Sequence, residues 1–152
     1  DDMNSRVIKS NGYHWEGVEK KDYKTDTTNF KDISRYSLLG EGPEDHELNM
    51  QTRYFEVQAG GYSSLEYHRH PHSVIIIRGS GSVILNHTVT PISTFDVVYI
   101  SPETVHQFHA DNNEALGFIC IVDRYRDKPV IPGQEIVDRL VGTGPARDKI
   151  RL

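Results

Sequence analysis

Short apolar runs separated by turn residues dominate the middle of the chain, between positions 51 and 124. The runs are rich in Val, Ile, Tyr and Phe, which are enriched in β-strands. They recur close to the spacing of about eight to twelve residues that is typical of a sandwich or barrel. The predicted strands are 52–57, 62–68, 73–78, 83–86, 95–100, 105–110 and 116–123. No helical period appears in this zone, so the pattern predicts an all-β domain.

The segments on either side of this zone have a different character. Residues 1–50 are polar and rich in turns, and their apolar stretch 30–39 is a candidate strand that periodicity does not settle. We expect residues 1–50 to pack on the domain or on a partner chain. The pattern of residues 125–152 predicts a short helix that begins at Pro132-Gly133. Its apolar stripe consists of Ile136, Val137, Leu140 and Val141. Residues 146–152 are expected to form a mobile or partner-bound tail.

Length and charge exclude several classes of protein. The chain has 152 residues, enough for one domain. Its 17 Lys+Arg and 22 Asp+Glu give 17 − 22 = −5, and the charges are spread out, which argues against nucleic-acid binding. No apolar run approaches the roughly 20 residues that span a bilayer. The acidic start and the single cysteine, Cys120, favour a cytoplasmic protein without disulfides.

Histidine is the exception to this ordinary composition. The chain has eight histidines, and six of them lie between positions 68 and 109: His68, His70, His72, His87, His106 and His109. Neutral imidazole is the commonest metal ligand in proteins, so this clustering predicts a metal site.

The segment from Gly60 to Gly79 resembles the first motif of the cupin superfamily, small jelly-roll barrels that hold one metal ion inside. That motif reads Gly, five residues, His-x-His, three residues, Glu, six residues, Gly. A register with His68 and His70 as the pair puts Val74 where the carboxylate belongs. A register that starts at Gly60 meets every spacing, with Glu66 and His68 as the pair and His72 as the third ligand. We adopt the second register, in which Glu and His are exchanged at two positions.

Strand geometry agrees with this register. Glu66 and His68 are two residues apart, so their side chains share a face of a strand. The turn 69–71 would then bring His72 to the start of the partner strand. His70 lies in that turn, where we expect it to support the ligands or to face solvent.

The segment from Asp96 to Phe108 resembles the second cupin motif, which supplies one more histidine from a distant strand. That histidine is His106. Phe95 and Thr104 stand where the motif has glycines, which affects turns and not the ligand. Phe108 shares the strand parity of His106 and is expected to line the cavity. His109, three residues from His106, is expected to face the other way.

The resemblance implies one divalent transition metal bound by Glu66, His68, His72 and His106. Three imidazoles and a carboxylate without a thiolate suit Mn(II), Fe(II), Ni(II), Co(II) or Zn(II). The predicted fold is an all-β double-stranded β-helix, the cupin jelly-roll barrel, with residues 51–124 as the barrel and a short C-terminal helix. Residues 28–40 can pair with a strand edge of the same chain or of a second one, so a homodimer is expected.

Longer stretches resemble a bacterial cupin group that includes methylthioxylulose phosphate sulfurylase, an enzyme of methionine salvage. These stretches include 53–57, 60–66 and 116–120. The resemblance implies removal of a methylthio group from a phosphorylated ketose, with a thiol cosubstrate such as glutathione. Cys120 is then a candidate catalytic residue, because it is the one protein thiol. A buried cysteine that only fills space is the competing interpretation.

A phosphorylated small-molecule substrate requires a local cation, because the protein as a whole is acidic. The candidates in the strand zone are Arg53, Arg69 and Arg78. The sequence favours Arg69, which lies in the turn beside two predicted ligands. Two other functions stay open: an Fe(II) dioxygenase, and a metabolite-binding module without turnover.

Overall fold

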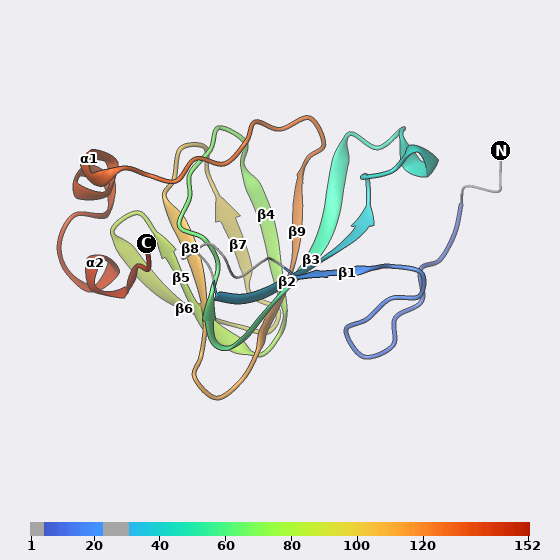
Figure 1. The fold of residues 1–152 in the computed structure, drawn as a ribbon, viewed down its shortest axis with the longest axis horizontal. Coiled ribbons are helices and arrows are strands. Elements are labelled where there is room, and N and C mark those ends of the chain that lie inside the picture. The colour runs from blue at the N-terminus through green and yellow to red at the C-terminus, as the bar shows by residue number, and fades with distance from the viewer. Residues whose placement is uncertain (1–4, 23–30) are drawn as a thin grey trace.

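A computed structural model describes residues 5–22 and 31–152, with no account of the Lys31 side chain, and these residues form one curled β-sheet (Figure 1). The strands are β1 (Lys20–Asp22), β2 (Lys31–Leu39), β3 (Met50–Tyr62), β4 (His72–Arg78), β5 (Ser80–Leu85), β6 (Thr88–Ser93), β7 (Val97–Ile100), β8 (His106–Ala110) and β9 (Leu116–Asp123). The helical segments are η2 (Pro43–Asp45), α1 (Gln134–Ile136), η3 (Val137–Val141) and α2 (Pro145–Lys149). None of these described helices is long and apolar enough to cross a membrane.

The strands follow the order β6-β5-β8-β3-β9-β4-β7, and β2 and β1 extend the sheet from β3. The two ends of this order meet, because residues of β5, β6 and β7 line one groove of about 270 Å³. The sheet therefore rolls up into a barrel, which confirms the all-β prediction and the short C-terminal helix.

One strand prediction, 62–68, was wrong, and one strand was missed. Residues 63–68 leave the sheet after β3 and keep only two isolated bridges, Glu66 to His106 and Tyr67 to Val130. The sequence also failed to indicate β6, which is polar and contains Pro91. Proline is tolerated there because β6 is an edge strand that pairs only with β5.

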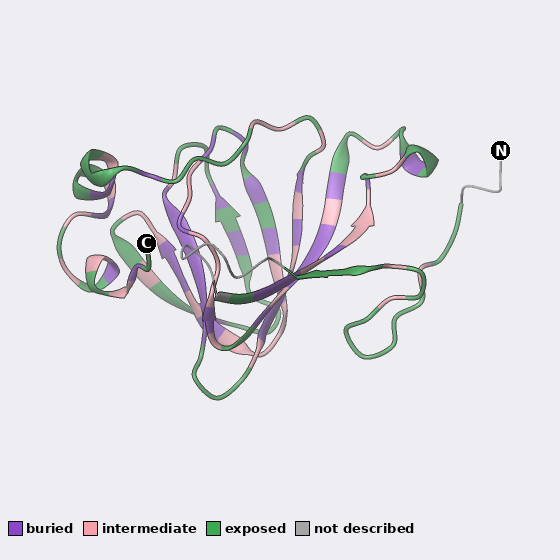
Figure 2. Cartoon of the chain, viewed as in Figure 1, coloured by how far each residue is buried: buried purple, intermediate pink, exposed green. Residues whose placement is uncertain are grey.

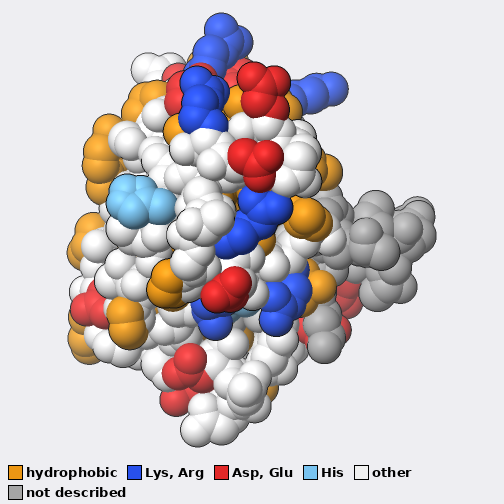
Figure 3. All heavy atoms as spheres, turned by 90° about the vertical axis from the view of Figure 1, so that its left-hand side faces the viewer, with side chains coloured by type: hydrophobic (Ala, Val, Ile, Leu, Met, Phe, Trp, Pro, Cys, Tyr) orange, Lys and Arg blue, Asp and Glu red, His pale blue; other side chains and the backbone are white. Residues whose placement is uncertain are grey.

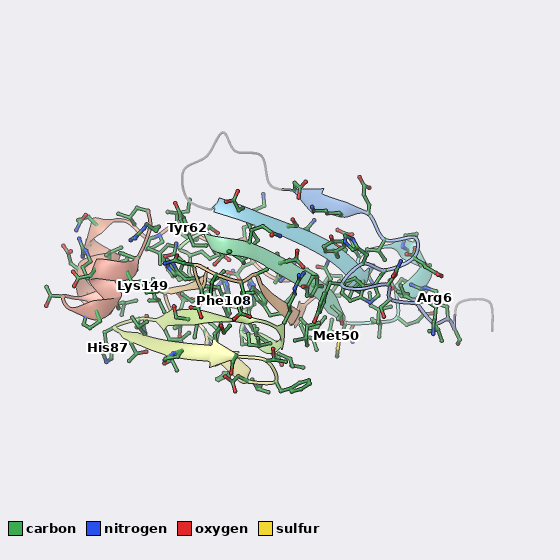
Figure 4. The ribbon with its side chains drawn as sticks, turned by 90° about the horizontal axis from the view of Figure 1, so that it is seen from below. Arg6, Met50, Tyr62, His87, Phe108 and Lys149 are labelled. Atoms are coloured by element: carbon green, nitrogen blue, oxygen red, sulfur yellow. The ribbon has the colours of Figure 1, made fainter. Side chains whose placement is uncertain are left out.

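Alternation along the strands builds the core (Figure 2). On β9 the side chains of Leu116, Phe118, Cys120 and Val122 are all buried, so this parity set faces the barrel interior. Phe118 stacks between two other rings, with centroid distances of 5.7 Å to Phe55 and 4.4 Å to Phe108. Phe108 thus lies inside the barrel, as its parity predicts (Figure 4).

The N-terminal segment covers the outside of β2 and β3. Trp15 packs against Tyr36 and Tyr54, with ring centroids 5.8 and 5.0 Å away. The candidate strand of the sequence forms β2, which pairs with β3 of the same chain. Phe30, Asp1–Asn4 and the first residues of the proposed dimer segment 28–40 lie outside the described residues.

The C-terminal segment closes one end of the barrel. Val137 and Val141, from the predicted apolar stripe, pack with Leu65, Ile84 and Val105 in a second core cluster. Residues 146–152 do not form a loose tail, because they begin in α2 and bury Ala146 and Ile150 in the same cluster. On the face where α1 and α2 lie, acidic and basic side chains alternate without a block of either sign (Figure 3).

We expect His109 to make the stability of the protein depend on pH. Burial, with Lys149 and Arg151 nearby, lowers the pKa of His109 to about 4 from the ordinary 6.5. The unfolded chain therefore takes up a proton on this ring at a higher pH than the folded chain does. The resulting stabilisation is complete above about pH 6.5 and is lost as the pH falls toward 4.

Urea unfolding at several pH values should show this for His109→Gln. Between about pH 7 and 4 the wild-type protein should lose roughly 3 kcal/mol more unfolding free energy than the variant. Parallel pH profiles of the two proteins would contradict the assignment.

Candidate metal centre

Three buried histidines meet inside the barrel from three parts of the chain. His68 belongs to the segment after β3, His72 begins β4 and His106 begins β8. One ring nitrogen of each lies within 4.8 Å of the others. The bridge that links Glu66 to His106 holds the segment after β3 against β8, with backbone hydrogen bonds of 3.2 and 2.9 Å. Three imidazoles that lie this close can hold a metal ion.

Hydrogen bonds orient two of the rings. The Nδ1 of His68 donates to the carbonyl oxygen of His70 at 2.7 Å, and the Nδ1 of His106 donates to that of Thr104 at 2.8 Å. A carbonyl accepts only, so Nδ1 carries the proton in both rings and Nε2 keeps its lone pair. The Nε2 of His68 is buried and has no hydrogen-bond partner among the described residues. Such an orphaned acceptor is what a metal ligand requires.

The protonation state of the cluster also suits a cation. Burial lowers the pKa of both His68 and His106 to about 4, and neighbouring imidazoles add to the effect. Burial lowers the pKa of His72 still further. The three rings are therefore neutral at physiological pH, which is the form that binds metal.

Glu66 lies at the edge of the cluster. Its Oε1 is 4.0 Å from the Nε2 of His68 and 3.8 Å from that of His106. The other carboxylate oxygen accepts a hydrogen bond from Ser64 at 2.8 Å. Burial raises the pKa of Glu66, against the hydrogen bond from Ser64. A cation between these groups would favour its ionised form.

His70 belongs to the same group of rings but has a partner of its own. Its ring stacks on His68 at 3.7 Å, and its Nε2 is 3.2 Å from the Nε2 of His72. Its Nδ1 donates to the carboxylate of Asp127 at 2.9 Å. Asp127 also accepts from the backbone amides of Arg69 and His70, at 2.9 and 3.0 Å. Asp127 therefore clamps the turn that joins His68 to His72.

No sequence pattern indicates Asp127. The residue follows β9, more than fifty positions from the turn that it holds, and nothing in its immediate sequence distinguishes it from other surface acids. Only the closure of the barrel brings the two segments together.

Replacing Asp127 by asparagine should weaken metal binding by about 10- to 100-fold, the usual effect of losing a partner that orients metal ligands. Arg69 donates to one carboxylate oxygen of Asp127 and His70 donates to the other, so asparagine would present an amide NH₂ where one of these donors needs an acceptor. Competition with a chromogenic chelator measures the affinity. Asp138→Asn is the matched control, because Asp138 pairs with Arg147 on the C-terminal helices. Equal affinities for Asp127→Asn and the control would show that the clamp does not matter.

Cys120 lies next to the histidine cluster. Its Sγ is 3.5 Å from the Nδ1 of His72 and accepts a hydrogen bond from Arg53 at 3.4 Å. The residue is only 2% exposed. Burial raises the pKa of the thiol, and the charge of Arg53 opposes that rise. The one thiol of the chain thus faces the interior, between a candidate metal ligand and a guanidinium.

The candidate arginines occupy very different places. Arg53 points into the barrel and is 7% exposed, whereas the Arg69 side chain is 81% exposed and lies 3.9 Å from Asp127. Arg78 pairs with Glu56 at 2.6 Å on the outside of β3 and β4. Of the three, Arg53 is the cation that shares the interior with the histidines. The sequence favoured Arg69 as the cation of the site. The structure differs, because the turn directs the Arg69 side chain to solvent.

The backbone conformation explains one glycine of the first motif and the loss of one glycine from the second. Gly79 turns between β4 and β5 with φ +70°, and a Cβ there would collide with the carbonyl oxygen of Ala115. Phe95, where the second motif has Gly, adopts φ 76°, a conformation that is unusual for an aromatic residue. The turn before β7 is therefore retained without its glycine.

Comparisons with known proteins agree with this architecture. A family model described as a cupin domain matches residues 53–122. A 1-methylthio-D-xylulose 5-phosphate methylsulfurylase of Rhodospirillum rubrum is 40% identical over 134 residues, covering 87% of this chain and 82% of that protein. A crystal structure of a cupin 2 conserved barrel domain protein from Rhodopseudomonas palustris has a TM-score of 0.87. It is 38% identical over 97% of this chain and 100% of its own. A cupin-2 domain structure from R. rubrum has a TM-score of 0.82 and 34% identity over 93% of each chain.

Proposed function

The chain belongs to the cupin family, and from that premise we propose that it is a metal-dependent methylsulfurylase acting on a phosphorylated ketose. The observation that carries this proposal is the contact between the single thiol and the histidine cluster, at 3.5 Å from Cys120 to His72. The 40% identity to the named methylsulfurylase supports it.

In this proposal Glu66, His68, His72 and His106 hold one divalent transition metal: Mn, Fe, Ni, Co or Zn. The neutral rings and the orphaned Nε2 of His68 support that set. When bound, the ion acts as a Lewis acid that polarises the ketose carbonyl. The buried rings around Phe108 exclude water from the same space.

Cys120 is proposed to attack the sulfur of the methylthio group. The carbon–sulfur bond breaks, its electron pair stays on carbon, and carbon takes up a proton to become a methyl group. Cys120 then carries a methyl disulfide, which exchanges with an added thiol such as glutathione. The thiol leaves as its methyl disulfide and Cys120 is regenerated, so the carbon is reduced at the expense of the thiol. The guanidinium of Arg53 would stabilise the Cys120 thiolate.

The test is an anaerobic incubation of metal-loaded protein with 1-methylthio-D-xylulose 5-phosphate and glutathione. The proposal predicts deoxyxylulose phosphate and the methyl disulfide of glutathione, in equal amounts and only when the thiol is present. Oxygen uptake without thiol would instead identify the Fe(II) dioxygenase. Binding of the sugar phosphate without turnover under either condition would identify the metabolite-binding module.

We propose a cytoplasmic homodimer as the working form. β2 pairs with β3 of its own chain, so the predicted dimer segment is already used within the chain. A second copy would instead pack on edge strand β7, where Phe95, Val97 and Tyr99 form an exposed row. Light scattering that shows a monomer at micromolar concentration would exclude the dimer.

A further inference from the structure

Several buried polar atoms in the barrel have no partner. Among the described residues, the Nε of Arg35, the Oγ of Ser37 and the Nε of Arg53 are buried without a hydrogen bond. Buried donors of this kind are rare in folded proteins, and each one requires an explanation. The three atoms belong to two neighbouring strands, β2 and β3.

The strand register brings these side chains together. Ser37 lies directly opposite Arg53, and Arg35 is two residues from Ser37 on the same face of β2. This face is the interior one, because Ile33 of β2 and Phe55 of β3 belong to the core on the same parity. Directly opposite residues of an antiparallel pair have Cβ atoms about 5 Å apart. The unpartnered donors therefore form one patch on the inner wall.

The patch has an excess of positive charge. Arg53 has no carboxylate within 4.0 Å in the part of the chain that the structure describes, and its Nη2 donates to Cys120, a weak acceptor. Arg35 reaches Glu41 only at 3.7 Å, and that carboxylate is 44% exposed. Arg126 is half-buried nearby, and burial together with Arg53 lowers its pKa. A buried guanidinium without an anion costs free energy, so binding an anion at this patch would stabilise the protein.

We propose that Arg35, Ser37 and Arg53 bind the phosphate of the substrate. This inference rests on the proposed function for the identity of the ligand, while the anion site stands on the three side chains alone. Two guanidinium groups and a hydroxyl offer the donors that a phosphate monoester accepts with its free oxygens. In this proposal Ser37 and Arg53, which lie opposite each other on β2 and β3, both donate hydrogen bonds to the phosphate.

The position of the patch sets the direction in which the proposed substrate would lie. Arg53 is directly opposite Cys120 in the β3–β9 register, and Cys120 contacts His72. The anion patch and the histidine cluster thus lie on two sides of the thiol. A phosphate anchored at Arg53 directs the remainder of a short sugar chain past Cys120 toward the histidines. The exposed Arg69 plays no part in this arrangement.

The first experiment uses the full, unmodified chain without metal and inorganic phosphate as the probe. In ¹H–¹⁵N spectra of the arginine side chains, phosphate should shift the Nε–Hε signals of Arg35 and Arg53. The signal of Arg147, which pairs with Asp138 on the C-terminal helices, is the internal reference. Signals of Arg35 and Arg53 that move no more than that of Arg147 would overturn the proposal. This measurement does not depend on whether a variant folds.

The second experiment compares affinities by calorimetry. Arg53→Gln and Arg35→Gln should each weaken phosphate binding by about 10- to 100-fold, since each removes charge-assisted hydrogen bonds. Arg147→Gln should bind like the wild type. D-Xylulose 5-phosphate should bind more tightly than D-xylulose and should compete with inorganic phosphate. Glutathione that competes with phosphate in place of the sugar phosphate would assign the patch to the cosubstrate carboxylate and overturn the substrate assignment.

Failure of this inference and failure of the proposed function give different results. Sulfurylase turnover with an unchanged KM in Arg35→Gln would leave the function standing and remove the anion site. Phosphate binding at Arg53 in a protein that never turns over the methylthio sugar would leave the site standing and remove the function.

Discussion

Protein carrying His106→Ala should bind its metal at least about 100-fold more weakly than the wild type, because loss of a ligand exceeds the loss of a supporting partner. His106 is one of the three buried rings whose nitrogens converge, and its Nδ1 is already committed to Thr104. Plasma mass spectrometry of protein purified without chelator should find close to one equivalent in the wild type. The variant should have lost it.

His87→Ala is the matched control. His87 lies at the turn between β5 and β6, exposed and directed away from the barrel interior (Figure 4). That variant should retain the wild-type metal content. Full metal occupancy in His106→Ala would refute the predicted ligand set.

The same measurement decides between the two registers of the first motif. Glu66→Ala should lower the metal affinity if Glu66 is a ligand. If Glu66→Ala binds normally and His70→Ala does not, His70 is the ligand and the chosen register is wrong. The 3.2 Å contact of His70 with His72 makes this comparison necessary.

Cys120→Ala and Cys120→Ser should both lose thiol-dependent turnover by roughly 100-fold or more, the scale of losing a group that acts on the reacting atoms. Their metal content should stay near that of the wild type, because the histidines remain. With substrate but no added thiol, mass spectrometry of the wild-type protein should find Cys120 heavier by one methylthio group. The two variants should show no such adduct.

A merely orienting role for Cys120 gives another pattern. The serine hydroxyl can accept a hydrogen bond from His72 in place of the thiol. Turnover that survives in Cys120→Ser and falls only in Cys120→Ala would therefore remove Cys120 from the chemistry. Loss of metal in both variants would likewise show that Cys120 acts by orienting His72.

The sequence alone determined the local features of this protein. Strand-length apolar runs between turn residues predicted most of the barrel, because alternation reflects burial on one face. The resemblance to the two cupin motifs pointed to Glu66, His68, His72 and His106, because each motif fixes the spacing of its metal-binding residues along the chain. The parity of β9 also required Cys120 and Phe118 to share a face, without saying which face.

Tertiary structure decided everything that depends on contacts between distant strands. It turned the Cys120 face inward, directed Arg69 to solvent and placed Arg53 beside the thiol. It brought Asp127 to the turn between His68 and His72, and it gathered Arg35, Ser37 and Arg53 on one wall. It also buried Ala146 and Ile150. Local sequence cannot indicate these contacts, because closing the sheet into a barrel is a property of all strands together.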